Sequence, residues 1–252
     1  MDIFSQHKER IVTGLIILAV VLIVAWINSP LLMWFALGGV YLLAFHEALK
    51  LYQIQTHNSL YFFAVVIWLL AAIYPYGNDL FVLAGVVYAS AIAYNKNLQW
   101  KYFLPFIYPT AGMLFIFTMY KEYDIISLIW LLVVVAMTDV GAYTVGKSIG
   151  KTRFCETSPN KTMEGVVGGI AVATLSGMFL GLTIVDFWIS FLISFFVATA
   201  SVFGDLFESS LKRSAGVKDS GNIFPGHGGM LDRIDGYLFG AIVMLVLLRG
   251  LV

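Results

Sequence analysis

The sequence predicts an all-α polytopic membrane protein with about nine transmembrane helices, and three observations support this fold class. First, 60% of the 252 residues are hydrophobic and only 12% are charged, whereas a soluble domain is about 45–50% apolar and about 25% charged. Second, the hydrophobic residues gather in runs that approach or reach the length of a membrane span. Third, the basic residues fall almost entirely on one side of those spans. The mean hydropathy of +0.88 agrees with a chain that folds in lipid.

Nine apolar segments follow one another along the chain, and a helix needs about 17–25 such residues to cross the hydrocarbon core. They lie at residues 11–27, 31–49, 60–74, 80–94, 102–119, 125–147, 165–183, 187–204 and 235–251. Short polar turns at residues 53–59 and 76–79 separate segments of the first half. The first segment has the basic and apolar character of a signal peptide, but no small-residue cleavage site follows residues 25–30 and further spans come after it. It is therefore expected to remain as a helix.

The distribution of Lys and Arg predicts the orientation. With a cytoplasmic N-terminus, thirteen of the 15 basic residues lie on the cytoplasmic side, and only Lys121 and Arg249 lie on the other. Membrane proteins carry such an excess in their cytoplasmic loops, and one missed or extra span would scramble it. We therefore predict nine spans with the C-terminus outside, in the inner (cytoplasmic) membrane of a bacterium.

Residues 1–120 are expected to form an N-terminal scaffold, since they are nearly all span and short turn. Their polar content is thin. His46 and Glu47 lie where the second span ends on the cytoplasmic side, and an interfacial helix end is the simplest explanation of both.

Residues 121–252 are expected to be the catalytic region. Two polar segments, at residues 146–164 and 205–235, interrupt this half and concentrate its charged residues on the predicted cytoplasmic face. A chain this poor in charge that gathers charge in two loops on one face is expected to form a site there. The single cysteine, Cys155, excludes an internal disulfide and a cysteine-based zinc site.

Residues 141–148 match the G-x-x-x-x-G-K-S pattern of a nucleotide-binding P-loop letter for letter. A P-loop follows a buried strand, but a span-length apolar segment precedes Lys147 and no partner strands are visible. Small residues recur here at spacings that let membrane helices pack closely: Gly141, Ala142, Gly146 and Gly150. We predict a packed membrane helix and interpret the match as an accident of composition.

An acidic residue, Asp139, lies within the same span, about two turns from its cytoplasmic end. A deeply placed carboxylate costs about 2.5–3.5 kcal/mol, and such groups usually face a cavity and have a partner. Two interpretations stay open, a structural pairing with a loop lysine and a functional role at the site.

The first cytoplasmic segment ends in S-P-N-K-T-M-E-G, residues 158–165. A turn leads into Lys161, Thr162 and Glu164, and Thr162 can cap the next helix. The basic residues of this segment can face anionic lipid or bind phosphate, and both interpretations stay open.

The second segment brings carboxylates to two helix ends. If the eighth span continues as a helix past Gly204, polar residues at i, i+3, i+4 and i+7 share one face: Asp205, Glu208, Ser209 and Lys212. Asp232 and Asp235 are i, i+3 where the last span begins, and the glycine-rich residues 225–229 between the two ends can form an anion nest.

Hard oxygen ligands beside Lys, Arg and backbone amides suit Mg²⁺ with substrate phosphates, which is the inventory for phosphoryl or nucleotidyl transfer. We predict that Asp205 and Asp232 hold a catalytic Mg²⁺, with Ser209 as a further ligand and Asp235 close by. A second, monovalent cation is an alternative that the sequence leaves open.

Residues 209–235 resemble the signature of the phosphatidate cytidylyltransferase (CDP-diacylglycerol synthase) family. The pattern is Ser-x-apolar-Lys-Arg, four residues, Lys-Asp, a short glycine-containing stretch, then His-Gly-Gly-apolar-x-Asp-Arg-apolar-Asp. Every fixed position is met: Ser209, Lys212, Arg213, Lys218, Asp219, Gly221, His227, Gly228, Gly229, Asp232, Arg233 and Asp235. Residues 139–146, 158–165 and 204–209 also resemble family motifs, whereas the first 120 residues resemble the family only in hydropathy and length.

The resemblance implies that CTP and phosphatidic acid react with Mg²⁺ to give CDP-diacylglycerol and pyrophosphate at the cytoplasmic face of the membrane. The catalytic candidates are Asp139, Asp205, Lys212, Arg213, Asp232 and Asp235. The candidates for substrate binding are Lys161, Thr162, Glu164, Lys218, Asp219, His227, Gly228, Gly229 and Arg233. The expected partners are CTP, phosphatidic acid and membrane lipids, with no nucleic acid, and a homodimer is left open.

Two rival functions remain. A CTP-dependent polyprenol or phytol kinase would transfer a γ-phosphate to an alcohol and release CDP. An ion-coupled transporter would release neither CDP nor pyrophosphate, and it would require polar residues deep in several spans. In this sequence the polar residues cluster at one face.

Overall fold

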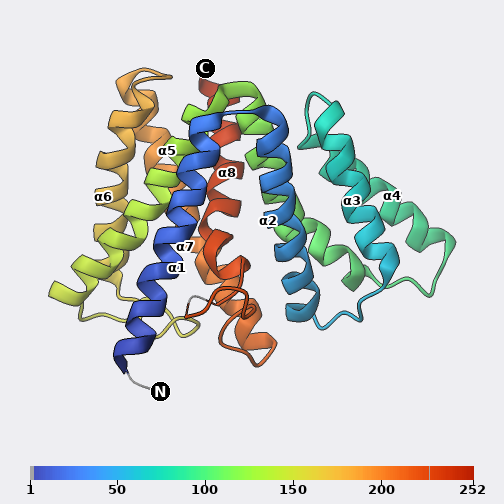
Figure 1. Ribbon diagram of the computed structural model, residues 1–252, viewed down its shortest axis with the longest axis horizontal. Helices are drawn as coiled ribbons and strands as arrows, with labels where there is room; N and C mark the ends of the chain where they lie inside the picture. The colour runs from blue at the N-terminus through green and yellow to red at the C-terminus, as the bar shows by residue number, and fades with distance from the viewer. Residues whose placement is uncertain (1–2, 227) are drawn as a thin grey trace. The chain divides into compact units, whose positions relative to one another are not determined.

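The computed structural model describes residues 3–226 and 228–252, and this part of the chain is almost entirely helical (Figure 1). The α-helices are α1 (Ile3–Ile27), α2 (Pro30–Leu51), α3 (Asn58–Ile73), α4 (Asp79–Tyr94), α5 (Gly112–Ile149), α6 (Met163–Gly181), α7 (Phe187–Ser214) and α8 (Leu231–Leu251). A short 3₁₀-helix, η1 (Trp100–Phe103), and a π-helix, η2 (Phe106–Ala111), precede α5. Among the described residues, extended pairing is limited to isolated bridges between Arg153 and Thr162 and between Phe224 and Gly228.

The prediction of an all-α membrane protein is confirmed. In the described part of the chain, five helical segments are long and apolar enough to cross a bilayer: α2, the continuous segment Trp100–Ile149, α6, α7 and α8. The apolar helices Val12–Ile27, Asn58–Ile73 and Asp79–Tyr94 are shorter. Large apolar side chains are exposed, among them Trp26 at 89% and Trp188 at 72%, which suits a surface facing lipid. The count of nine spans and their orientation stay predictions.

Helix α5 contains a break at Asp124, whose φ of 58° and ψ of −174° are not helical. A straight helix of 38 residues would be about 57 Å long, far beyond a hydrocarbon core of about 30 Å. The break is stabilised locally, because Asp124 Oδ1 accepts from Ile125 N at 2.7 Å and Ser127 Oγ donates to Asp124 O at 2.7 Å. It falls between the two spans predicted at residues 102–119 and 125–147.

The chain divides into two compact units. Unit 1 comprises Met1–Thr118 and Ser214–Ile234, and unit 2 comprises Met119–Arg213 and Asp235–Val252. Unit 1 therefore joins the N-terminal helices to most of the second polar segment. Unit 2 contains the first polar segment and the greater parts of α5, α7 and α8.

Unit 1 has an aromatic core around α2. Trp34 Nε1 donates to Trp68 O at 3.0 Å and Trp68 Nε1 donates to Trp34 O at 3.1 Å, which ties α2 to α3. Tyr41 is fully buried, and its hydroxyl lies 3.0 Å from Thr110 Oγ1 in η2. These contacts fix α2 along its length, and with it the residues near its C-terminal end.

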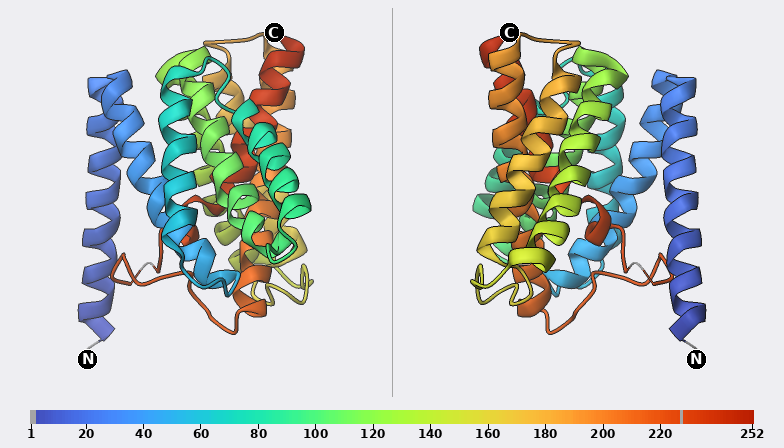
Figure 2. Two further views of the ribbon diagram at one scale, coloured as in Figure 1. Left: turned by 90° about the vertical axis from the view of Figure 1, so that its right-hand side faces the viewer. Right: turned by 90° about the vertical axis from the view of Figure 1, so that its left-hand side faces the viewer.

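Unit 2 is built on close contacts between helices. In α5 and α6, a Cβ added to Gly141 would lie 2.9 Å from Gly169 Cα, and one added to Gly169 would lie 2.6 Å from Thr138 O. The segment that matches the P-loop pattern is thus a continuous helix packed on α6, as predicted. Figures 1 and 2 show α6 beside the second half of α5, and Figure 2 shows α6, α7 and α8 running side by side.

Candidate functional site

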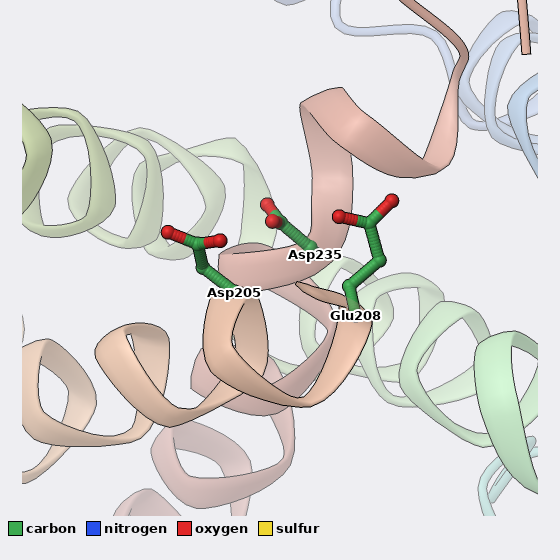
Figure 3. Close-up of side chains that lie close together, drawn as sticks. All are labelled: Asp205, Glu208 and Asp235. Atoms are coloured by element: carbon green, nitrogen blue, oxygen red, sulfur yellow. The ribbon is translucent and has the colours of Figure 1, made fainter. Parts of the chain in front are cut away.

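Three carboxylates of unit 2 meet where α7 and α8 cross. Asp205 and Glu208 lie on α7 and Asp235 lies on α8, and each offers one oxygen within 4.8 Å of the others. Figure 3 shows the three side chains rising on the same side of the two helices. We call this set the carboxylate triad. The close approach depends on Gly204, because a Cβ there would lie 2.5 Å from Asp235 O.

The local pattern on α7 follows the sequence prediction, because this helix continues past Gly204 to Ser214. One turn separates the members of each contact. Ser209 Oγ donates to Asp205 Oδ1 at 3.3 Å, and Lys212 Nζ lies 2.5 Å from Glu208 Oε2. The predicted set of polar side chains on one face is therefore present.

Basic residues of unit 2 partner the triad. Lys161, from the loop that precedes α6, forms an ion pair with Asp205. Lys212 pairs with Glu208, whose side chain is fully buried. Asp139, exposed on α5, adds a further negative charge to the electrostatic environment of Asp235, as do Asp205 and Glu208. This favours a role at the site for Asp139 over an isolated structural pairing.

The charge balance of this region favours a cation. Two unit charges of like sign at 4 Å repel each other by about 4 kcal/mol at an effective dielectric constant of about 20. The triad and Asp139 bring four carboxylates together, while Lys161 and Lys212 provide two ammonium groups. Carboxylate oxygens in this number are the ligands that Mg²⁺ prefers in proteins. The residues present therefore fit a divalent cation.

A second acidic cluster lies in unit 1, at the N-terminal end of α8. Asp232 Oδ2 accepts from Ser220 N, Ser220 Oγ and Gly229 N, each at 2.8 Å. Ser220 Oγ also lies 2.9 Å from Glu47 Oε2. We call Glu47, Ser220 and Asp232 the carboxylate pair cluster. Its donors are neutral backbone amides and a hydroxyl, in contrast to the lysines of the triad.

Glu47 is 1% exposed, so its interpretation as an interfacial helix end is wrong. Its Oε1 accepts from Met230 N at 2.9 Å, and its Oε2 accepts from Leu231 N at 2.8 Å. These donors lie 183 and 184 residues away along the chain. The only local signal was an acidic residue in the last turn of an apolar helix, where the helix dipole disfavours a negative charge.

The glycine-rich segment was expected to form an anion nest, and its amides do face anions of the protein itself. Gly229 N is directed at Asp232, and Met230 N and Leu231 N are directed at Glu47. Gly228 has a φ of +81°, and a Cβ there would lie 2.6 Å from Asp232 Oδ2. A role for Gly228 and Gly229 in substrate binding stays a prediction.

The first loop is organised by two of its predicted substrate-binding residues. Thr162 Oγ1 accepts from Gly165 N at 3.2 Å and caps α6, as the sequence predicted. The Glu164 carboxylate accepts from Lys151 N at 3.1 Å, Thr152 N at 3.2 Å and Thr152 Oγ1 at 2.9 Å. Both side chains therefore shape the loop that carries Lys161, and their contact with substrate stays a prediction.

The remaining candidates divide between the units. Arg213 is exposed near the end of α7 in unit 2. Exposed side chains in unit 1 are those of Lys218, Asp219 and Arg233. His227 lies outside the described residues. Asp205 and Asp232 belong to different units, and their sharing of one ion stays a prediction.

Comparison with known proteins places this inventory in a family context. Residues 8–251 match a family model described as "Cytidylyltransferase family". The chain is 44% identical over 245 residues to a phosphatidate cytidylyltransferase of Helicobacter pylori strain J99, covering 96% of this chain and 92% of that protein. It is 30% identical to a protein of the same name from Thermotoga maritima, covering 96% of each chain. A third, from Bacillus subtilis, is 46% identical over 122 residues, or 47% of this chain and 45% of its own.

Proposed function

The chain belongs to the cytidylyltransferase family, and from that premise we propose how it carries out its reaction. It is a nucleotidyltransferase that transfers the cytidylyl group of CTP to phosphatidic acid, giving CDP-diacylglycerol and pyrophosphate. Its substrates are therefore CTP and a membrane lipid. The observation that carries the proposal for the site is the carboxylate triad with its lysine partners.

The triad is the proposed cation site, with Asp205, Glu208 and Asp235 as the residues that would hold Mg²⁺. Ser209 lies within hydrogen-bonding distance of Asp205 and is the proposed neutral oxygen ligand. When bound, the ion neutralises charge on phosphate oxygens and on the leaving pyrophosphate. Asp232 remains a ligand candidate from its place in the signature.

The chemistry asks little of a general base. A phosphate oxygen of the lipid is already an anion at neutral pH, and it attacks the α-phosphorus of CTP. A P–O bond forms there, and the bond to the bridging oxygen of pyrophosphate breaks with its electron pair on the leaving group. Lys161, Lys212 and Arg213 carry the positive charges proposed to bind phosphate oxygens and to align them for in-line attack.

The location of the site follows the charge distribution. The proposed orientation puts both polar segments in the cytoplasm of a bacterial cell, where CTP and the lipid head group meet at the inner membrane surface. The exposed signature residues of unit 1 are proposed to contact the substrates at this surface: Lys218, Asp219 and Arg233. No nucleic acid is expected to bind.

Product analysis tests the function. The purified protein, given CTP, phosphatidic acid and Mg²⁺ in detergent, should form CDP-diacylglycerol and pyrophosphate in equal amounts. Release of CDP instead would indicate a lipid kinase, and release of neither would favour a transporter. The same assay in excess chelator should give no product if the cation is required, and activity that survives chelation would contradict the proposed Mg²⁺ site.

A further inference from the structure

We propose that Glu47 is a positioning residue for cytidylyl transfer, because its buried carboxylate fixes the N-terminal end of α8 and the orientation of Asp232. The inference rests on the proposed function for its kinetic consequences, but the contacts that carry it lie entirely within unit 1. Glu47 stands outside the sequence signature, on a helix expected to be scaffold.

The first step of the argument is the burial of a charge. Glu47 is 1% exposed, and an ionised carboxylate in that environment needs several hydrogen-bond donors. Ser220 Oγ, Met230 N and Leu231 N supply them at 2.8–2.9 Å. Because these donors come from the signature segment and not from α2, the charge of Glu47 is stabilised only when that segment is in place.

The second step concerns the helix that receives the carboxylate. Leu231 is the first residue of α8, and it is fully buried. The first amides of a helix lack intrahelical partners, and a negative charge at this end is favoured by the helix dipole. Glu47 satisfies Leu231 N and the preceding Met230 N together. It therefore fixes where α8 begins, one residue before Asp232.

The third step links Glu47 to Asp232 through a shared hydroxyl. Ser220 Oγ lies 2.9 Å from Glu47 Oε2 and 2.8 Å from Asp232 Oδ2. A serine hydroxyl has a single proton, which the two carboxylates must share. Asp232 N in turn donates to Ser220 Oγ at 3.3 Å. A displacement of Glu47 therefore changes the hydrogen bonding of Asp232 directly.

The fourth step explains two glycines of the signature. A Cβ on Gly221 would lie 2.3 Å from Glu47 Oε1, and one on Gly229 would lie 2.5 Å from both carboxylate oxygens of Glu47. Any other residue at either position would push the carboxylate away. The fixed glycines therefore leave room for Glu47 itself, which supports a specific role for this residue.

Burial also distinguishes the role of Glu47 from that of a group that touches substrate. A side chain 1% exposed has no surface for CTP or lipid, so its removal should act on Asp232 and leave substrate binding largely intact. Displacements of about 1 Å at a reacting centre can lower a rate about 10²-fold. The signature of positioning is therefore a fall in kcat with little change in KM.

The test compares Glu47→Gln, Ser220→Ala and the double variant with the parent protein. Glu47→Gln keeps the size of the side chain but directs an amide donor at a backbone N–H. We expect each single variant to lower kcat about 10- to 100-fold with the KM for CTP within about threefold. Because both act through one hydroxyl, the double variant should fall no more than about threefold below the weaker single variant.

A matched control and a readout independent of turnover complete the test. Tyr41→Phe removes another buried hydrogen bond of unit 1, and it should leave kcat within about twofold. Hydrogen exchange should show faster exchange of residues 229–232 in Glu47→Gln and parent-like exchange there in Tyr41→Phe. If Glu47→Gln fails to fold, Ser220→Ala alone must show both the fall in kcat and the faster exchange.

Three results would overturn the proposal. They are a kcat within twofold of the parent in folded Glu47→Gln, unchanged exchange at residues 229–232, or fully multiplicative effects in the double variant. An inactive parent protein would instead contradict the proposed function, and the exchange measurement would still decide whether Glu47 holds the segment.

Discussion

The two acidic clusters contain the same residue types in different chemical surroundings. In unit 1, Glu47 and Asp232 accept hydrogen bonds from backbone amides and a serine hydroxyl. In unit 2, Asp205, Glu208 and Asp235 approach one another, and their assigned partners include two lysines. Neutral donors offset the burial of a carboxylate without a cation, whereas carboxylates that face one another gain from one. The difference indicates an organising role for the first cluster and a cation site for the second.

The largest effect is expected from the triad. Asp205→Asn and Asp235→Asn each remove one negative charge where a divalent cation is proposed to bind. Loss of a single group that stabilises charge in the transition state typically lowers kcat about 10²–10³-fold, and we expect a fall in that range or beyond. Steady-state kinetics with CTP and phosphatidic acid, at saturating Mg²⁺ and on folded protein, provide the measurement.

A charged pair elsewhere in unit 2 supplies the control for these variants. Arg249 Nη2 lies 2.5 Å from Glu122 Oε1, and the pair is outside the triad. Glu122→Gln should leave kcat within about threefold. Equal losses in Glu122→Gln and Asp235→Asn would show that removing any ion pair of the unit disables the protein, and the contrast between the clusters would then lose its basis.

A smaller effect is expected from Gly204→Ala, which alters the spacing of the triad and leaves its charges intact. The added Cβ would lie 2.5 Å from Asp235 O and 3.1 Å from Phe239 Cβ, so α7 and α8 must separate. Overpacking of this kind costs about 1–3 kcal/mol, and we expect kcat to fall about tenfold. Gly39→Ala is the control, because no atom lies within 4 Å of its added Cβ. Parent-like activity in Gly204→Ala would show that triad spacing is unimportant.

The smallest effect is expected at the segment that matches the P-loop pattern. Ser148 Oγ donates to Thr144 O at 2.7 Å within α5, and Ser148 belongs to neither acidic cluster. Ser148→Ala should keep kcat and the KM for CTP within about twofold. A folded but inactive variant would show that this serine contributes to catalysis, and the division into two clusters would then be incomplete.

Local physics explains which features could be predicted from the sequence. The continuation of α7, the cap at Thr162 and the packed helix at residues 141–148 depend on neighbours a few positions away, on helix periodicity, side-chain chemistry and residue size. The break at Asp124 falls at a predicted turn, because one apolar segment there was too long for a single span.

The features that the sequence did not predict depend on distant partners. Glu47 contacts residues 173–184 positions away, and its own neighbourhood is an apolar helix with no matching charge pattern. Lys161 meets Asp205 across 44 residues, and Ser220 was simply a small residue in a polar loop. Such pairings follow from tertiary packing, which helix periodicity does not specify.

The central claim is that the carboxylate triad, and not the carboxylate pair cluster on its own, holds the divalent cation. An anomalous difference map from crystals of the protein soaked in Mn²⁺ tests it most directly, because the ion is located without reference to activity. The account predicts a peak within coordination distance of Asp205, Glu208 and Asp235, which is absent when Asp235→Asn is soaked in the same way. A peak bound only by Glu47, Ser220 or Asp232, with none at the triad, would contradict it.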